Sequence, residues 1–192
     1  MKTLLMTLLL AAAADPPAAP SAASFVPQDP AARLAAQREA MKALDFMDGA
    51  WRGEARTDRL PAGFVHTERS GTLLDGTVRL IEGRSYDEKG GTRFNALATI
   101  SYDPARRAYT MHSHAMSYVG DFPLEVRPDG YSWTQPAGPG AKIHYVATVK
   151  GGEWREVGER VVDGAPPQKV FEMVVRRIGA TTWPKDGAVG PR

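Results

Sequence analysis

The stretch Asp48-Gly49-Ala50-Trp51-Arg52-Gly53-Glu54 separates two kinds of pattern in this chain. Helix-forming residues dominate before it. After Gly49, short runs of alternating apolar and polar residues are separated by turn signals such as Asp75-Gly76, Asp103-Pro104 and Asp163-Gly164, which tolerate positive φ or preset a turn. The sequence therefore predicts that Trp51 opens the first of a long series of antiparallel strands.

Counting the alternating runs gives about ten strands at the even spacing typical of a sandwich or barrel. Hairpin turns between consecutive runs favour an up-and-down meander, and closing that meander removes its exposed edges. We therefore expect an all-β protein, an antiparallel up-and-down β-barrel with one N-terminal helix. The strands are expected near residues 50–57, 63–74, 77–86, 92–102, 107–115, 119–127, 130–135, 142–150, 153–162 and 169–177.

One helix is predicted immediately before the barrel. Asp29 is an N-cap residue, Pro30 suits the first helical position, and strong helix formers follow as far as Ala43. We expect its apolar stripe to cover an open end or side of the barrel, with a partner-binding helix as the alternative. The stripe consists of Leu34, Met41 and Leu44.

Composition excludes several functional classes. A chain of 192 residues with 43% hydrophobic content suits a single domain, and a net charge of +2, spread over 24 basic and 22 acidic residues without charged blocks, argues against a nucleic-acid partner. The absence of cysteine excludes disulfides, thiolate metal sites, a cysteine nucleophile and a lipid-attachment cysteine. Packing and hydrogen bonds must hold the fold.

The first residues are typical of an export signal. Lys2 precedes an apolar run from Leu4 to Leu10, and small residues lead to a cleavage site expected after Ala14. The run is shorter than the ~20 residues that span a bilayer, so we expect no stable membrane insertion, with an uncleaved anchor as the alternative. We predict a signal peptide at 1–14, an Ala/Pro-rich linker at 15–28, the barrel domain with its helix at 29–178 and a tail at 179–192. The mature protein is expected to be exported, to the periplasm or beyond, with Trp183 folded back onto the barrel exterior.

Alternation also predicts which side chains face the lumen, because consecutive residues of a strand point to opposite faces. Small residues among the inward positions, including Gly53, Ala55 and Ala98, favour a cavity large enough for a small hydrophobic or amphipathic ligand; the alternative is that the larger rings fill the space. The residues expected to contact the ligand are Phe94, Tyr109, Met111, Trp133, Tyr145, Phe171 and Met173.

Glu82 is expected to point inward, because it shares a strand face with Val78 and Leu80. A buried carboxylate needs a partner, and Arg84 lies two residues further along the same face. The pair is interpreted as an internal ion pair near the barrel mouth or, alternatively, as a pair that orients the polar end of a ligand. General acid or base work by Glu82 is a third alternative.

Several stretches resemble known families. Gly49-Ala50-Trp51 resembles the Gly-x-Trp signature of the calycins, the lipocalins and fatty-acid-binding proteins, and Trp51-Arg52-Gly53-Glu54 is similar to the start of the nitrobindin barrel. A longer pattern resembles an uncharacterised lipocalin-like family of exported bacterial proteins over about residues 45–185. These resemblances imply the calycin fold and no particular activity, while the nitrobindin likeness would imply haem held by a histidine late in the barrel, where His144 is the only candidate. The longer pattern comprises Ser101-Tyr102-Asp103-Pro104 with Tyr109, Gly130-Tyr131-Ser132-Trp133, Gly152-Glu153-Trp154 with Glu156 and Gly158, Phe171-Glu172-Met173 and Trp183-Pro184.

The remaining candidates for chemistry are histidines. His112 and His114 lie two apart on one predicted strand, so both rings could bind one metal ion, with His66 or His144 as a third ligand. The predicted strand phase turns His112, His114 and His144 outward, however, so we expect no metal site and no cofactor.

The sequence also lacks a Gly-x-Ser-x-Gly elbow, a phosphate-binding loop and a His-Glu-x-x-His motif. We favour a binding protein, with an enzyme acting on a lipid-like substrate or a structural envelope module with a filled barrel as alternatives; the oligomeric state stays open.

Overall fold

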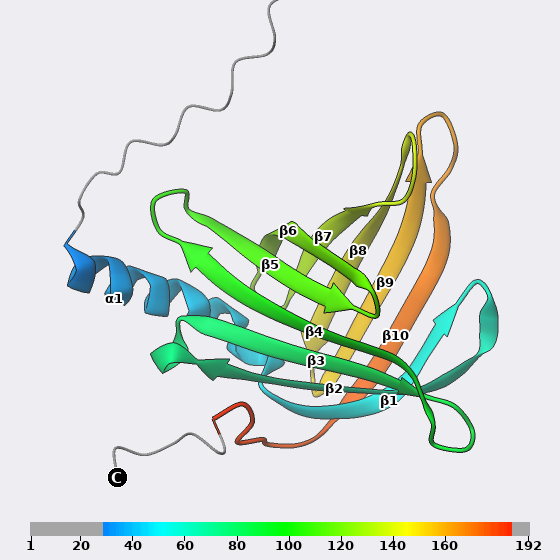
Figure 1. Ribbon diagram of the computed structural model, residues 1–192, viewed down its shortest axis with the longest axis horizontal. Coiled ribbons are helices and arrows are strands. Elements are labelled where there is room, and N and C mark those ends of the chain that lie inside the picture. Colours follow the sequence, from blue (N-terminus) through cyan, green and yellow to red (C-terminus); the bar gives the residue numbers. More distant parts are fainter. Residues whose placement is uncertain (1–28, 186–192) are drawn as a thin grey trace, which may run out of the picture.

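The computed structural model describes residues 29–185, and the predicted signal peptide and linker therefore lie outside the described residues. Helix α1 (Pro30–Met41) and the 3₁₀-helix η1 (Lys42–Met47) precede ten antiparallel strands that close into a barrel (Figure 1). Each strand pairs with its neighbours in the chain, and β1 also pairs with β10. The predicted all-β barrel is confirmed. Its strands are β1 (Gly49–Thr57), β2 (Leu60–Leu73), β3 (Val78–Tyr86), β4 (Thr92–Asp103), β5 (Ala108–Ala115), β6 (Tyr118–Arg127), β7 (Gly130–Pro136), β8 (Ala141–Lys150), β9 (Glu153–Val162) and β10 (Gln168–Gly179), and a 3₁₀ turn, η2 (Leu74–Gly76), connects β2 to β3.

Helices α1 and η1 cover one end of the barrel. The Asp29 side chain accepts a hydrogen bond from the Ala31 backbone N–H at 3.0 Å, which is the predicted cap. Met41, Leu44 and Met47 are fully buried against the barrel core. Leu34 is 40% exposed, so its place in the predicted apolar stripe was wrong: α1 projects away from the core at its N-terminal half and only its last turn packs inward (Figure 1).

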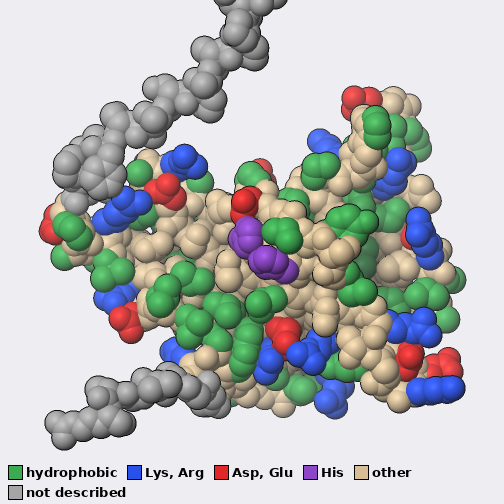
Figure 2. Space-filling model, viewed as in Figure 1, with side chains coloured by type: hydrophobic (Ala, Val, Ile, Leu, Met, Phe, Trp, Pro, Cys, Tyr) green, Lys and Arg blue, Asp and Glu red, His purple; other side chains and the backbone are tan. Residues whose placement is uncertain are grey.

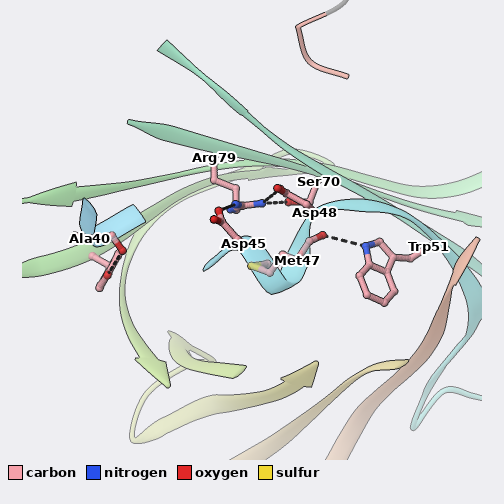
Figure 3. Close-up of polar contacts among 8 residues, drawn as sticks. Ala40, Asp45, Met47, Asp48, Trp51, Ser70 and Arg79 are labelled. Atoms are coloured by element: carbon pink, nitrogen blue, oxygen red, sulfur yellow. Dashed lines mark hydrogen bonds and ion pairs between the residues drawn. The ribbon is translucent and has the colours of Figure 1, made fainter. Parts of the chain in front are cut away.

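The core is concentrated at this closed end. The Trp51 ring meets the Trp154 ring edge-on, with centroids 5.7 Å apart, and Trp154 in turn meets Tyr131 at 6.2 Å. Two further hydrogen bonds join the barrel to the helices: Trp51 Nε1 donates to the Met47 carbonyl at 3.0 Å, and the Tyr109 hydroxyl donates to the Ala40 carbonyl at 2.6 Å (Figure 3). The stretch beginning at Asp48 thus fixes η1 and the first strand to each other.

A buried arginine on β3, two strands from β1, also holds the junction between η1 and the barrel. Arg79 on β3 is completely buried, and its guanidinium donates to Asp45 Oδ1 at 3.0 Å, to Asp48 and to Ser70 Oγ at 3.1 Å (Figure 3). Asp45 belongs to η1, Asp48 follows it, and Ser70 lies on β2. One planar cation therefore ties the helical plug to two strands of the wall, a geometry that the arginine fork suits.

The opposite end of the barrel is open because β6 and β7 separate. The β5–β6 pairing runs from Ala115↔Tyr118 to Tyr109↔Leu124, whereas β6 pairs with β7 only from Leu124↔Trp133 to Arg127↔Gly130. Beyond these pairs the β5–β6 hairpin and the β7–β8 hairpin diverge, as Figure 1 shows. Trp133 belongs to the last of these pairs before the hairpins diverge, and its side chain is partly exposed.

The outer surface carries the end of the chain. The Arg69 guanidinium lies 4.4 Å from the centroid of the Trp183 ring, and the Trp183 carbonyl lies over Gly71 of β2, so the predicted return of Trp183 to the exterior is confirmed. Among residues 29–185, neither helix has the length and apolar character needed to cross a membrane.

Candidate functional site

The seven apolar residues predicted to face the lumen lie on inward strand faces, but they divide into two groups. Tyr109, Met111 and Met173 pack into the core of the closed end. Trp133 and Tyr145 stack with centroids 4.2 Å apart at 7°, and Phe171 meets Tyr145 at 6.0 Å. Phe122 joins the same row, 5.1 Å from Trp133. Phe94 lies near the open end of β4, opposite Ser85, on the face that carries the buried Ile100.

This second group forms an aromatic wall, which we define as Phe122, Trp133, Tyr145 and Phe171. All four side chains are partly exposed, and they come from β6, β7, β8 and β10. They lie beside the region where β6 and β7 separate, so flat apolar surface is accessible from the open end. The sequence analysis predicted three of these residues, Trp133, Tyr145 and Phe171, as ligand contacts, and that role stays a prediction.

Glu82 and Arg84 were predicted to point into the lumen, and this prediction was wrong. The two residues do pair, with Arg84 Nη2 donating to Glu82 Oε1 at 2.6 Å, and Arg69 also donates to Glu82. Although partial burial opposes ionisation, the hydrogen bonds from Arg69 and Arg84 hold the pKa of Glu82 below its usual range. Arg69 lies on the exterior under Trp183, so the whole cluster is on the outer wall and cannot orient a ligand in the lumen.

The error follows from the composition of β3. Its inward face carries Arg79, Ile81, Gly83 and Ser85, of which only Ile81 is apolar. Its outward face carries Leu80, which pairs in register with Gly71, where Trp183 covers the wall. Val78 and Leu80 thus lie on the outward face while the charged Arg79 lies on the inward one, which is the reverse of the usual pattern, and the alternation alone then indicates the wrong side.

A polar cluster that the sequence reading did not assign lies inside the barrel. Glu156 on β9 is 8% exposed, and the Tyr131 hydroxyl donates to its Oε2 at 2.6 Å. Burial raises the pKa of Glu156 to about 7; the Tyr131 hydrogen bond opposes this rise and the nearby charge of Glu68 adds to it. Glu156 lies two residues after the buried Trp154 and therefore shares its strand face. This spacing was the feature of the sequence that could have predicted that Glu156 points inward.

The second half of the cluster comes from β2 and β3. His66 is 3% exposed; its Nε2 lies 2.9 Å from Glu68 Oε1 and its Nδ1 lies 2.7 Å from Ser85 Oγ. Glu68 Oε2 is buried and makes no hydrogen bond within the described residues. The Glu68 carboxylate lies over Gly83, where a Cβ would approach Oε1 to 2.7 Å, so the glycine leaves room for it. The charges of both Glu68 and His66 act on Glu156, which places the two halves in one region of the lumen.

The other histidines lie on the outer wall, as predicted. His144 Nδ1 is 3.0 Å from Thr134 Oγ1, on the face opposite the inward Tyr145, so His144 cannot hold a haem in the lumen. In the lumen, both ring nitrogens of His66 already have partners. No group of three or more His, Cys, Asp or Glu side chains is arranged around a common metal position within residues 29–185.

Two hollows open at the rims of the barrel. One, of about 490 Å³, lies beside η1 and is lined by Phe46, Tyr109 and Val126, among others. The other, of about 650 Å³, lies at the open end between the β1–β2 and β3–β4 hairpins, where Phe64 and Tyr86 contribute to it. Neither is lined by Glu68 or Glu156, so neither of these two hollows reaches the polar cluster.

Comparison with known proteins supports the fold. No protein-family model matches the sequence, and no curated protein matches it. Among solved structures, the chain is similar to the crystal structure of Rv2717c from M. tuberculosis, with a TM-score of 0.53 and 12% identity over 72% of this chain and 96% of that one. At this identity the likeness shows the fold alone. The ten-stranded closed barrel fits a lipocalin-like barrel fold, while membership of the calycin or nitrobindin families stays a prediction.

Proposed function

We propose that this barrel binds a small amphipathic molecule whose apolar part lies against the aromatic wall and whose polar end is a hydrogen-bond donor, with an amine as the clearest case. The observation that carries the proposal is Glu68 Oε2, a buried carboxylate oxygen that has no hydrogen-bond partner among residues 29–185, in the same region as Glu156. We also propose that the protein is exported, on the basis of the signal pattern in residues 1–14.

The polar cluster around Glu68 and Glu156 favours a ligand whose polar end donates a hydrogen bond. Leaving a buried charged acceptor unpaired costs more than an ordinary hydrogen bond returns, so a group that donates to Glu68 Oε2 recovers stabilising energy. Two carboxylates in one region disfavour an anionic ligand and favour a cation. A charge-assisted hydrogen bond contributes about 1.5–3 kcal/mol, which is roughly 10- to 100-fold in affinity.

The apolar part of the ligand has a defined surface to meet. Trp133 and Tyr145 present parallel rings, and Phe171 continues the surface across the wall onto β10. Flat aromatic surface of this kind binds alkyl chains and rings with little loss of side-chain entropy, because each residue has only two rotatable side-chain torsions. The open end of the barrel between β6 and β7 supplies the entrance.

The test compares three probes of equal chain length: decylamine, decanol and decanoate, each titrated below its micellar concentration and followed by calorimetry and tryptophan fluorescence. We expect decylamine to bind most tightly. The Glu68→Gln variant should weaken decylamine binding by about 10-fold or more and decanol binding less, because the neutral hydroxyl loses a charged acceptor but not an ion pair.

Glu82→Gln is the matched control, because Glu82 lies on the outer wall and its loss leaves the lumen intact. Equal affinity for decylamine and decanoate would overturn the assignment of a donor head group. Absence of binding by all three probes would favour the structural module with a filled barrel.

A second candidate function is favoured by one observation. The pKa of Glu156, raised to about 7 by burial, suits a residue that accepts and returns protons near neutral pH. An enzyme acting on a lipid-like substrate in the same lumen would use it as general acid or base. Glu156→Gln would then abolish turnover of the substrate while retaining binding of the uncharged decanol probe.

A further inference from the structure

A pair of histidines on the outer face of β5 has a geometry that the binding function does not use. His112 and His114 project from the same face, with ring centroids 4.8 Å apart and their Nε2 atoms 3.1 Å apart. Figure 2 shows two histidine side chains side by side on the surface, next to an acidic side chain. Each ring is accessible to solvent, with the His112 side chain 44% exposed.

The separation of the two nitrogens matches that of two ligands on one metal ion. Imidazole nitrogens bind zinc at about 2.0–2.1 Å, so two of them at an angle between 90° and the tetrahedral value lie about 2.9–3.4 Å apart. The observed 3.1 Å falls inside this range. In the metal-free protein these nitrogens share a hydrogen bond, in which His114 Nε2 donates to His112 Nε2; a metal ion would take the place of that proton, with His114 carrying its proton on Nδ1 instead.

A carboxylate holds one ring in the required tautomer. His112 Nδ1 lies 2.6 Å from Asp121 Oδ1 on the neighbouring strand β6. Because a carboxylate oxygen accepts and does not donate, the ring proton lies on Nδ1 and leaves the Nε2 lone pair free. This is the arrangement by which carboxylates orient histidine ligands and raise their basicity in metal sites.

The surroundings favour a cation. The residues opposite the pair in register are Thr99 and Leu97 on β4, and Asp121 and Val119 on β6. Asp121 is the only charged residue among these four, and it is negative. No cation directly opposite either ring competes with a metal ion.

From this geometry we propose that His112 and His114 form a two-histidine site for a divalent transition-metal ion, with Asp121 as a positioning residue. Water completes the coordination, because residues 29–185 offer no third ligand at this position. The site is predicted to be weaker than a closed four-ligand site and to follow the general order of divalent affinities, with Cu²⁺ above Ni²⁺ and Zn²⁺. It is independent of the lumen and of the proposed ligand.

The experiment is a calorimetric titration of the tag-free mature protein with Ni²⁺, together with the electron paramagnetic resonance spectrum at one equivalent of Cu²⁺. We expect one Ni²⁺ per chain and, in the copper spectrum, coupling to two imidazole nitrogens. His112→Gln and His114→Gln should each remove this binding, and His144→Gln is the matched control that leaves it unchanged.

Asp121→Asn separates the positioning role from the ligands. It should retain one metal per chain and both nitrogen couplings while weakening affinity about 10-fold. Thermal unfolding of each variant without metal checks that the barrel is intact. The proposal is overturned if the His112→Gln/His114→Gln double variant binds Ni²⁺ as the wild type does, or if an intact wild-type protein binds none.

Discussion

The Tyr131 hydroxyl reaches Glu156 Oε2 across an intervening strand, and Ala147 makes that contact possible. Tyr131 on β7 pairs with Ala147 on β8, and Ala147 pairs with Glu156 on β9, so the three residues form one row across the inner wall. The 2.6 Å hydrogen bond passes over the small alanine side chain. A carboxyl group that would otherwise be isolated in the lumen is thereby held in one orientation, beside the aromatic wall.

The first prediction concerns stability and pH. Burial raises the pKa of Glu156 to about 7, so between its ordinary value of 4.5 and about 7 the folded protein holds a proton that the unfolded chain has lost. The free energy of unfolding should therefore fall as pH rises through this window, by up to about 3 kcal/mol, and the loss should be complete above pH 7. In Glu156→Gln this contribution is absent.

Urea unfolding of both proteins at pH 5, 6, 7 and 8 measures the effect. The stability of the variant relative to the wild type should increase steadily from pH 5 to 7 and then level off. A difference that does not change with pH would show that Glu156 titrates near its ordinary value.

The second prediction concerns the pH dependence of ligand binding. Decylamine stays cationic from pH 6 to 8, whereas Glu156 goes from mostly protonated to mostly ionised. If the cation pairs with ionised Glu156, its affinity should rise about 10-fold between pH 6 and pH 8. Calorimetry at both pH values provides the measurement, with decanol as the uncharged control. Glu156→Gln should make decylamine binding independent of pH; a rise that persists in this variant would assign the effect to another group.

The third prediction concerns the arginine that fastens the helical plug. Arg79→Ala removes a completely buried side chain and its hydrogen bonds to Asp45, Asp48 and Ser70, and should lower the free energy of unfolding by about 2–3 kcal/mol, because the two carboxylates left behind are about half exposed and stay hydrated. Arg176→Ala is the matched control, because the Arg176–Glu153 pair is on the surface and is expected to contribute less than about 1 kcal/mol. Urea unfolding measures both. Similar losses in the two variants would mean that η1 is held by apolar packing alone.

Much of this architecture follows from the sequence, because turn signals and alternation act locally. The strand expected at 92–102 is Thr92–Asp103, and the expected helix cap at Asp29 forms as predicted. Trp133 was placed inward correctly because it lies between the polar Ser132 and Thr134, and Tyr145 because it shares a strand face with Ile143 and Ala147.

The polar cluster was harder to predict, because its strand faces do not separate apolar from polar residues. The β2 stretch Thr67-Glu68-Arg69 offers no apolar side, and only pairing with β1 determines that Glu68 lies opposite the inward Trp51. Glu82 was placed inward because it shares a strand face with Val78 and Leu80. The face that is inward carries Arg79 instead, and its burial depends on the long-range contacts with Asp45 and Asp48, which the sequence of β3 alone does not reveal. Glu156 was predictable from its spacing to Trp154.

The fourth prediction tests how closely strands β1 and β10 pack against each other at Gly53. Gly53 lies on β1 against β10, where a Cβ would come within 2.1 Å of the Val174 carbonyl oxygen and 2.8 Å of Val175 Cα. Both contacts are with backbone, so the strands themselves would have to separate, and overpacking of this kind costs about 1–3 kcal/mol. Gly53→Ala should reach the upper part of this range. Gly179→Ala is the control on the same pair of strands, because nothing lies within 4 Å of its Cβ position, and it should change stability by less than about 0.5 kcal/mol. Equal unfolding midpoints for the two variants in urea would show that β1 and β10 adjust freely around position 53.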